Sequence, residues 1–486
     1  MLTTKIAIKE SYGHFINGEW TNPVNNQYFD EYNPSTGEKI ASFARGDQED
    51  INRAVQNAEE GFKAWYALEP YQRGQIMMNV ASLLRKHKAD FVYMESVDVG
   101  KPLYLAELEL EMCARAFEYC AGAADKIFGE VIPGSARQLS YSVREPYGVT
   151  AHITPWNSPL LVGTRGCASA LAAGNSVVIK VAENTSLSTL EFAALCIEAG
   201  VPSAVVNVVT GYGREAGAAL VNHPKIRKIC FTGSVQTGTS IMKAAAERIV
   251  PVTLELGGKS PNIIFEDADL RSATAGAIQA FIVNTGQVCA GGTRLLVQRS
   301  IVDTFTERLA EGLKQVTIGN GVENPTIGPV VSEKQLSRIE HYVKLGQEEG
   351  AELVCGGNRL TNGKLRNGFF IEPTIFKNVT SSMTIAKEEI FGPVLSIIPF
   401  DTEEEAMDLA NDTEYGLAAA IWTSNIKRAH RVVKQIQAGQ VYINDYLPSG
   451  AEGRPFGGYK KSGIGREGGM AGIYGFTQTK TVTIKC

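Results

Sequence analysis

The chain has 486 residues, of which 44% are hydrophobic and 20% are charged, and its formal net charge is −5. This length and composition are typical of a globular protein with two or three domains. The lack of a basic excess argues against a nucleic-acid-binding protein. No stretch has the roughly 18 unbroken apolar residues of a membrane-spanning helix, and the first twenty residues contain no apolar core of signal-peptide length. We therefore expect neither a nucleic-acid nor a membrane partner.

The eight cysteines are scattered along the chain, with no C-x-x-C pair and no adjacent histidine. This spacing argues against both a disulfide framework and a zinc site, and we expect no bound metal. Most of these cysteines are expected to be small buried apolar residues. Unpaired thiols are typical of a reducing compartment, so we expect a cytoplasmic protein.

The N-terminal third is predicted to be helical. Apolar side chains from Ile51 to Trp65 recur at helical spacing, and Asp47 is the predicted N-cap. Two further helices are predicted at residues 73–88 and 105–121. Residues 138–143 (QLSYSV) then alternate between apolar and polar side chains, as an exposed strand does.

From Tyr147 onward, short apolar runs (GVTAHI, SVVIK, VNVVTG and KICFTG) alternate with helical stretches. This rhythm predicts a parallel sheet with helices on both faces. A second segment of the same kind starts near Ser260, and residues 479–485 form a strand-like tail. The predicted fold class is therefore α/β, with two α/β lobes and a strand-rich segment that we expect to serve assembly.

Two motifs in the first lobe have features of a dinucleotide site. Gly233 and Ser234 lie where a strand ends and a helix begins, and the free N–H groups of a helix N-terminus bind phosphate. Lys180 ends another strand, and Glu183 follows three residues later. A carboxylate at this point binds ribose hydroxyls and repels a 2′-phosphate, which favours NAD over NADP. An ordinary strand–helix turn and a surface Lys–Glu pair are the alternatives.

Three side chains suit covalent chemistry. Cys289 lies in a Gly- and Ala-rich stretch, and a thiolate near helix N–H groups is an activated nucleophile. Glu255 lies between two leucines, where a carboxylate has a raised pKa and suits general-base work. Asn157 is bracketed by two prolines that direct its amide at a developing oxyanion. The alternatives are an inert buried cysteine, a solvated strand-end glutamate and a turn-capping asparagine.

Seven motifs in this order resemble the aldehyde dehydrogenase superfamily, and together they span nearly the whole chain. They are PWNSP, K-x-A-E, FTGS-x-x-x-G, ELGGKSP, GQ-x-C, EEIFGPV at 388–394 and PFGGYKKSGIGRE at 455–467. The resemblance implies that Cys289 attacks the aldehyde carbon while Asn157 and the Cys289 N–H hold the oxyanion. The thiohemiacetal would pass a hydride to NAD, and Glu255 would activate the water that hydrolyses the thioester. Glu467 resembles a residue of the family's proton path.

The resemblance also implies a set of NAD contacts. Lys180 and Glu183 would contact the adenosine ribose, Ser234 the pyrophosphate, and Glu389 and Phe391 the nicotinamide ribose and ring. NADP is the less favoured cofactor because of Glu183. The complete predicted set of cofactor residues is Ile153, Trp156, Lys180, Glu183, Gly233, Ser234, Glu389 and Phe391.

The implied architecture has a Rossmann-like NAD-binding domain at residues 1–122 and 147–257, and a catalytic domain at 258–457. An oligomerisation segment is expected at 123–146 and 477–486, where a protruding β-hairpin pairs with the C-terminal tail. A homodimer or a homotetramer is the expected assembly, because members of the superfamily are usually dimeric or tetrameric.

The sequence departs from the family pattern after Asn157. Many members carry an aromatic residue and then a lysine eight and nine positions later, where this chain has Arg165 and Gly166. The missing lysine removes part of the usual proton path. We assign Arg165, together with Phe456, to the substrate. A guanidinium either pairs with a carboxylate, as in the succinate semialdehyde branch, or stacks on a ring, as in the benzaldehyde, vanillin and salicylaldehyde branch. A purely structural salt bridge is the third alternative.

Val283 stands where the semialdehyde branch tends to carry a second arginine. We therefore expect an aromatic or otherwise hydrophobic aldehyde as the substrate, with a semialdehyde as the alternative. Glu255 argues against a CoA-acylating enzyme, in which this base is typically absent. A non-catalytic structural or binding protein on the same scaffold is a more distant alternative, because Cys289, Glu255, Asn157 and Glu389 are all present.

Overall fold

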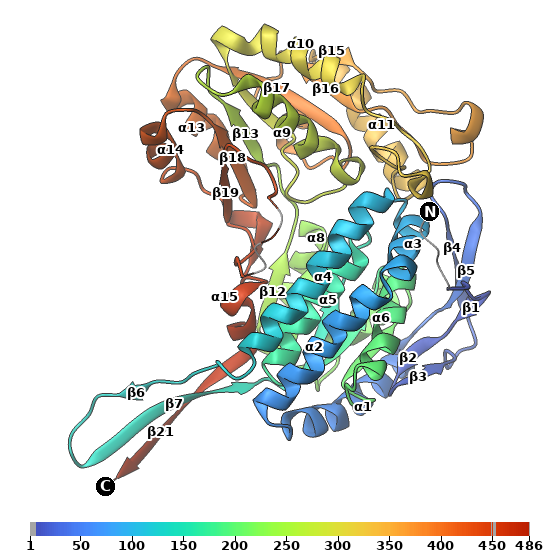
Figure 1. Ribbon diagram of the computed structural model, residues 1–486, viewed down its shortest axis with the longest axis vertical. Helices are drawn as coiled ribbons and strands as arrows, with labels where there is room; N and C mark the ends of the chain where they lie inside the picture. The colour runs from blue at the N-terminus through green and yellow to red at the C-terminus, as the bar shows by residue number, and fades with distance from the viewer. Residues whose placement is uncertain (1–5, 449, 451–452, 486) are drawn as a thin grey trace.

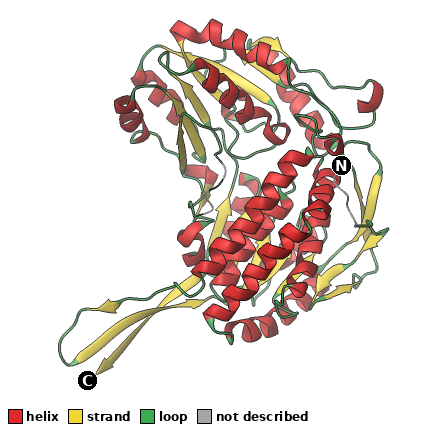
Figure 2. Cartoon of the chain, in the orientation of Figure 1, coloured by secondary structure: helices red, strands yellow, loops and turns green. Residues whose placement is uncertain are grey.

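The computed structural model describes residues 6–448, 450 and 453–485. Two lobes, each built on one large sheet, form the body, and a thin three-stranded sheet projects away from the first lobe (Figure 1). Helices cover the faces of both large sheets (Figure 2). The prediction of an α/β fold is confirmed.

The N-terminal segment combines five short strands with four helices, so the prediction of helices alone is wrong for residues 11–44. The strands are only two to six residues long, too short to establish a clear alternation. They are β1 (Ser11–Tyr12), β2 (His14–Ile16), β3 (Glu19–Thr21), β4 (Tyr28–Tyr32) and β5 (Lys39–Ala44).

The helices that follow agree with the periodicity in three of four cases. In α1 (Gln48–Tyr66), Asp47 is the N-cap and accepts hydrogen bonds from the N–H groups of Glu49 and Asp50. α2 (Pro70–Lys86) and α4 (Leu103–Ala123) occupy the other predicted positions. α3 (Lys88–Val99) was not predicted, because Glu95 and Asp98 are buried among its apolar residues and disrupt the apolar pattern.

The first large sheet has the strand order β20-β12-β11-β8-β9-β10-β2-β3. Its five central strands are parallel. They are β8 (Val149–Ile153), β9 (Ser176–Lys180), β10 (Val206–Val209), β11 (Lys228–Thr232) and β12 (Val252–Glu255). The connecting helices are α5 (Pro159–Ala172), α6 (Leu187–Glu198), α7 (Ala218–Asn222) and α8 (Val235–Glu247).

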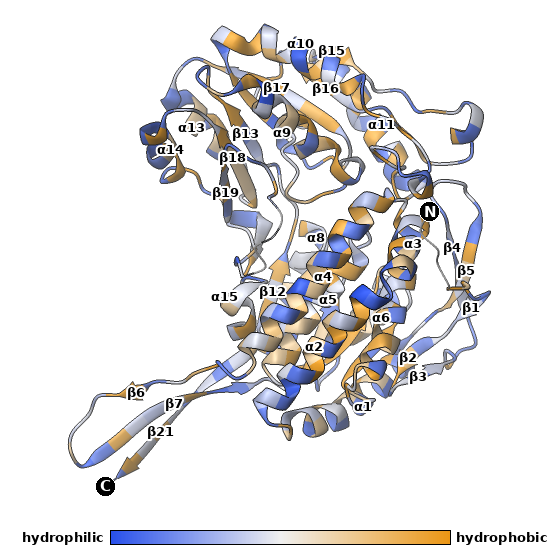
Figure 3. Cartoon of the chain, viewed as in Figure 1, coloured by the Kyte–Doolittle hydropathy of each residue, from blue (hydrophilic) through white to orange (hydrophobic). Residues whose placement is uncertain are grey.

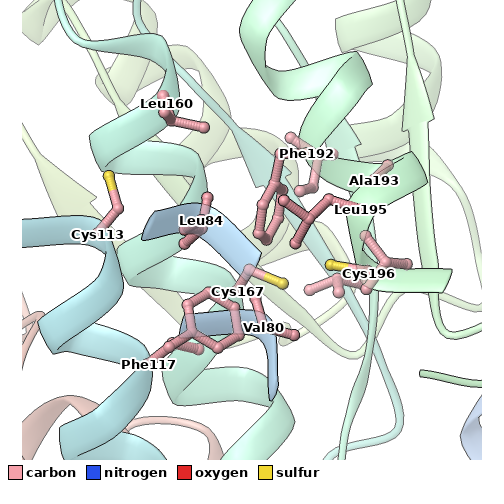
Figure 4. Packing of buried hydrophobic residues seen from close by; sticks show 14 of the residues in the cluster. Val80, Leu84, Cys113, Phe117, Leu160, Cys167, Phe192, Ala193, Leu195 and Cys196 are labelled. Atoms are coloured by element: carbon pink, nitrogen blue, oxygen red, sulfur yellow. The ribbon is translucent and has the colours of Figure 1, made fainter. Parts of the chain in front are cut away.

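Both faces of this sheet are buried, which explains its continuous apolar strands. Val177 and Ile179 of β9 pack in the core with α2, α4, α5 and α6, whereas Val178 packs in the opposite core with α1, α7 and α8. Figure 4 shows Cys167 near Phe117 and Val80, and Cys196 near Leu195, in the first of these cores, where the thiols serve as small apolar groups.

The second large sheet has the order β15-β16-β17-β14-β13-β18-β19, and only the edge strand β15 is antiparallel. Its strands are β13 (Pro261–Ile264), β14 (Arg294–Gln298), β15 (Glu352–Cys355), β16 (Thr374–Lys377), β17 (Val394–Phe400), β18 (Ala418–Trp422) and β19 (Gln440–Ile443). The longer helices of this lobe are α9 (Leu270–Ile282), α10 (Val302–Leu313), α11 (Glu333–Glu348), α13 (Glu403–Asn411) and α14 (Ile426–Val433), and the four-residue α12 (Thr384–Lys387) lies between β16 and β17.

The projecting sheet pairs β21 (Thr477–Lys485) antiparallel with β7 (Gln138–Pro146), and β6 (Val131–Ile132) with the other edge of β7. Its strands alternate between hydrophobic and hydrophilic colours, whereas the strands of the large sheets are mostly hydrophobic (Figure 3). Between the second lobe and this tail, the chain returns to the first lobe. There β20 (Gly463–Ile464) pairs with β12, and α15 (Gly469–Tyr474) packs on α5.

Candidate active site

A cavity of about 800 Å³ lies between the two lobes and brings together most of the predicted site residues. Its lining includes Asn157, Glu255, Cys289, Arg165 and Phe456 at one end, and Glu183 and Ser234 at the other. Of the predicted residues, Ile153, Lys180 and Glu467 do not line it. Ile153 is part of the core, while Lys180 and Glu467 lie behind residues that do line it.

The topology of the first sheet explains where the cavity opens. From β8 the chain moves through β9 to β10, and it then returns to place β11 on the other side of β8. Loops that leave neighbouring strands in opposite directions leave a crevice at the carboxyl ends of the strands, where dinucleotides bind. The loops after β8, β9, β11 and β12 all contribute residues to the lining.

Asn157 is held by two hydrogen bonds to the loop that carries Cys289. Its Nδ2 donates to the carbonyl oxygen of Gln287 at 2.8 Å, and its own carbonyl oxygen accepts from Nδ2 of Asn284 at 3.0 Å. The first bond uses one of the two amide N–H groups and orients the other. The predicted oxyanion donor and the predicted nucleophile are therefore fixed to one another across the lobes.

The backbone before Cys289 adopts an unusual conformation. Asn284, Thr285 and Gly286 have φ values of 49°, 56° and 72°, a left-handed path that costs free energy for residues with a Cβ. Tertiary contacts hold it: Thr285 Oγ1 donates to the carbonyl of Gly328 at 2.9 Å. The Gln287 side chain adds two bonds, to Asn284 and to the N–H of Val331. Sequence reasoning missed Gln287, although it stands inside the GQ-x-C motif.

Burial and the nearby carboxylates Glu389 and Glu255 raise the pKa of the Cys289 thiol to about 12, and Arg165 opposes this shift. The resting side chain is therefore a thiol. Glu255, the predicted base, is only 2% exposed, and both of its carboxylate oxygens are buried without a hydrogen-bond partner. Burial and the charge of Glu467 raise its pKa well above the usual value.

Arg165, which is partly exposed to the cavity, forms an ion pair with the buried carboxylate of Glu467. Its Nε and Nη2 lie 2.7 and 2.6 Å from Oε2 of Glu467, and the guanidinium carbon lies 5.0 Å from the centre of the Phe456 ring. The Cys230 thiol donates to the other oxygen, Oε1, at 3.2 Å. Gly166 leaves room for the His152 ring, whose Nδ1 would be 2.9 Å from a Cβ at this position. Sequence reasoning missed Cys230 and His152.

At the other end of the cavity, Ser234 caps α8 by accepting a hydrogen bond from Thr237 N–H at 3.3 Å, so the N-terminus of a 13-residue helix faces the lining. The N–H of Gly233 donates to the Glu255 carbonyl at 3.0 Å and joins the ends of β11 and β12. Lys180 Nζ lies 3.1 Å from Oε2 of Glu183. These groups fit a pyrophosphate and a ribose diol.

Between the two ends lie Glu389 and Phe391. Oε1 of Glu389 accepts from the N–H of Gly258 at 3.0 Å, and burial raises its pKa to about 7. A Cβ on Gly257 would lie 2.2 Å from Oε2 of Glu389, so a side chain at this position would displace the carboxylate from its place beside Gly258. Phe391, with φ of 61°, packs edge-on against Trp156 with 5.2 Å between ring centres.

Two further features bear on function. Within the described ranges, no group of three or more His, Cys, Asp or Glu side chains is arranged to hold a metal ion. None of the helices in the described part of the chain has the length and apolar character needed to span a bilayer.

Comparison with known proteins identifies the family of this chain. The profile of the aldehyde dehydrogenase family matches residues 20–482. The chain is 43% identical to betaine aldehyde dehydrogenase of Bacillus subtilis, with 96% of each chain covered, and 44% identical to the mitochondrial aldehyde dehydrogenase of Rattus norvegicus, covering 97% of this chain and 91% of the relative. The NAD⁺ complex of a Bacillus cereus aldehyde dehydrogenase superposes with a TM-score of 0.96 at 43% identity, covering 98% of this chain and 97% of that one. The chain therefore belongs to the aldehyde dehydrogenase family.

Proposed function

We propose that this chain oxidises an aldehyde to the carboxylic acid with NAD, through a covalent intermediate on Cys289. The observation that carries the proposal is the junction of three groups in one cavity: a thiol, an amide cross-linked to the loop of that thiol, and a buried unpartnered carboxylate. Nucleophile, oxyanion donor and base are the three roles that acyl-enzyme chemistry requires.

In the first half of the reaction, Cys289 Sγ bonds to the aldehyde carbon. The carbonyl oxygen becomes an oxyanion, which accepts hydrogen bonds from Nδ2 of Asn157 and from the Cys289 N–H. Glu255 takes the thiol proton and passes it to solvent. As the oxyanion re-forms a carbonyl, the C–H bond of the former aldehyde breaks, its hydrogen leaves as a hydride, and a thioester remains on Cys289. When bound, NAD would supply the acceptor for this hydride and a positive charge that favours the thiolate.

In the second half, Glu255 removes a proton from the water that attacks the thioester carbon. The C–S bond then breaks, the carboxylic acid is released, and the leaving Cys289 thiolate takes the proton back from Glu255. Its raised pKa makes Glu255 a stronger base than an ordinary carboxylate. Glu467 does not line the cavity, and its negative charge raises the pKa of Glu255. Arg165 is a guanidinium that does not lose its proton, so it stabilises Glu467 and does not relay protons.

The groups at the opposite end of the cavity would hold the cofactor. Ser234 and the N-terminus of α8 would bind the pyrophosphate, Lys180 and Glu183 the adenosine ribose, and Glu389 the nicotinamide ribose. Trp156 and Phe391 would flank the nicotinamide, and Gly233 and Ile153 shape the wall behind it. Glu183 disfavours the 2′-phosphate of NADP.

For the substrate, we infer an aromatic or otherwise hydrophobic aldehyde. Many of the side chains that line the cavity are apolar, among them Leu105, Met112, Leu161, Val283, Tyr442 and Phe456. Of these, Tyr442 and Phe456 belong to the same apolar cluster as Cys289. Arg165 reaches this wall with its charge already balanced by Glu467, so it has less to offer a substrate carboxylate than an unpaired arginine. Its stacking on Phe456 favours a role beside a ring.

The test follows NADH formation by purified protein over benzaldehydes, short aliphatic aldehydes, betaine aldehyde and succinate semialdehyde, with Cys289→Ala as the control. We expect benzaldehydes to give the highest kcat/KM and the variant to be silent. A preference for succinate semialdehyde would assign Arg165 to a carboxylate. NADH formation by no aldehyde, or an active variant, would reject the covalent mechanism and favour a non-catalytic protein.

We also propose that the chain assembles as a homodimer or homotetramer through the projecting sheet and acts in the cytoplasm. Val131, Leu139 and Ile484 on this sheet, and Phe128 just before β6, are exposed apolar side chains, which mark association surfaces when they cluster. The seven cysteines of the described part are free thiols, as suits a reducing compartment. Light scattering of the purified protein tests the assembly, and a monomer would reject it.

A further inference from the structure

A buried ionic cluster lies behind the Asn157 loop. Lys101, which is fully buried, contacts Oε2 of Glu95 with its Nζ at 2.6 Å and also pairs with Oε2 of Glu109. The two carboxylates raise the pKa of Lys101 against the effect of burial, so the lysine stays charged. Glu95 is on α3 and Glu109 on α4. Burying such a cluster costs free energy, because its charges lose their contact with water.

Both carboxylates reach the N-terminus of α5, which directly follows Asn157. Oε1 of Glu109 accepts a hydrogen bond from Ser158 Oγ at 3.0 Å. Oε1 of Glu95 accepts from the N–H of Leu160 at 3.3 Å. A negative cluster is favourable at this end of a helix, because the helix dipole is positive there.

The hydrogen bond of Ser158 is unusual for its position. A serine at an N-cap normally accepts a hydrogen bond from the second or third N–H of its own helix. Ser158 makes no such bond. Instead, Glu95 accepts the hydrogen bond from the N–H of Leu160, the second residue of the helix. The Ser158 hydroxyl is thereby released to connect the residue next to Asn157 with Glu109, whose carboxylate is fixed by Lys101.

We propose that Ser158, Glu109 and Lys101 form a positioning relay for the oxyanion donor. Asn157 is tied to the Cys289 loop on one side by Gln287, and Ser158 ties the same turn to the first lobe on the other. Together, the Gln287 and Glu109 hydrogen bonds hold the Asn157 side chain in one orientation, so that its remaining amide N–H points in a fixed direction. Loss of the Ser158 tie leaves the nucleophile intact and lets the donor move.

The chain offers a matched control. Ser188 is a second buried serine that donates to the same cluster, from its Oγ to Oε1 of Glu95 at 2.6 Å, but it lies in α6 and not beside the site. Ser158→Ala and Ser188→Ala each remove one hydroxyl from the cluster. A purely structural cluster predicts the same outcome for both variants.

The test, which rests on the proposed function, measures the rate of the first turnover of NADH formation at saturating aldehyde. We expect Ser158→Ala to lower this rate about tenfold, less than the 10²–10³ that loss of an oxyanion donor costs, with KM changed less than about twofold and Ser158→Thr restoring the rate. Ser188→Ala is expected to lower Tm and keep the parent rate. Alkylation of Cys289 by iodoacetamide should proceed at the parent rate in both variants.

A double-mutant cycle shows whether Ser158 acts through Asn157. If it does, Ser158→Ala lowers the first-turnover rate in the parent and has no further effect in Asn157→Ala. Equal losses in Ser158→Ala and Ser188→Ala, an unchanged rate in Ser158→Ala, or additive effects in the double variant would each overturn the proposal. A parent protein that forms no NADH with any aldehyde would instead reject the proposed function.

Discussion

Gly258 provides the sharpest test of how closely the loop between β12 and β13 must approach the nucleophile. A Cβ at this position would lie 2.4 Å from the carbonyl oxygen of Cys289. Ordinary contacts begin at 3.4 Å, so Gly258→Ala has to move the Cys289 backbone by about 1 Å. The N–H of Gly258 also donates to Glu389, so the loop has little freedom to retreat.

The expected loss follows from that displacement. A misplacement of about 1 Å costs on the order of 10²-fold in rate, because the reacting atoms leave their near-attack geometry. Overpacking of this kind costs about 1–3 kcal/mol of folding free energy. We therefore expect Gly258→Ala to fold, to melt several degrees lower than the parent, and to lose about 100-fold in the first-turnover rate.

The assay combines first-turnover NADH formation with the rate of Cys289 alkylation, which needs no knowledge of the physiological aldehyde. Gly122→Ala is the control, because this exposed glycine in α4 has no atom within 4 Å of its added Cβ. It should keep the parent rate and gain about 0.5–1 kcal/mol, the usual gain of alanine over glycine in a helix. A Gly258→Ala variant within twofold of the parent would refute the reasoning.

Three further predictions concern the charged residues of the site. Glu467→Gln should shift the rising limb of the kcat–pH profile to lower pH. The charge of Glu467 raises the pKa of Glu255, and without it the base is ionised at lower pH. A shift of this limb to higher pH would contradict the prediction. Arg165→Met should lower the free energy of unfolding in urea by about 3–5 kcal/mol, since it leaves the Glu467 carboxylate buried without its cation. The double variant Arg165→Met, Glu467→Leu should recover much of that loss. A double variant less stable than the single one would show that the ion pair is not the cause. Glu183→Ser should raise the NADP-to-NAD ratio of kcat/KM about tenfold, the equivalent of about 1.4 kcal/mol, because it removes a repulsive carboxylate and leaves Lys180 to pair with the 2′-phosphate; an unchanged ratio would remove Glu183 from cofactor selection.

Local pattern was sufficient for much of the fold. The β-α-β rhythm after Tyr147 predicted a parallel sheet because strands buried on both faces must be continuously apolar. α1 was predicted through the spacing of Ile51 to Trp65 and the cap at Asp47. The short N-terminal strands were not predicted, because two to six residues carry little periodicity. Helix α3 was not predicted, because buried Glu95 and Asp98 interrupt its apolar pattern.

Residue type and local motif were enough to predict a nucleophile, a base and an amide donor. The contacts that hold these side chains became visible only in the folded chain. Gln287 joins Asn157 to the Cys289 loop, Glu467 balances Arg165, and Glu109 takes the Ser158 hydroxyl. These partners are separated by 130, 302 and 49 residues along the chain. Local spacing carries no information on such contacts, since they exist only once packing has brought distant segments within hydrogen-bond distance.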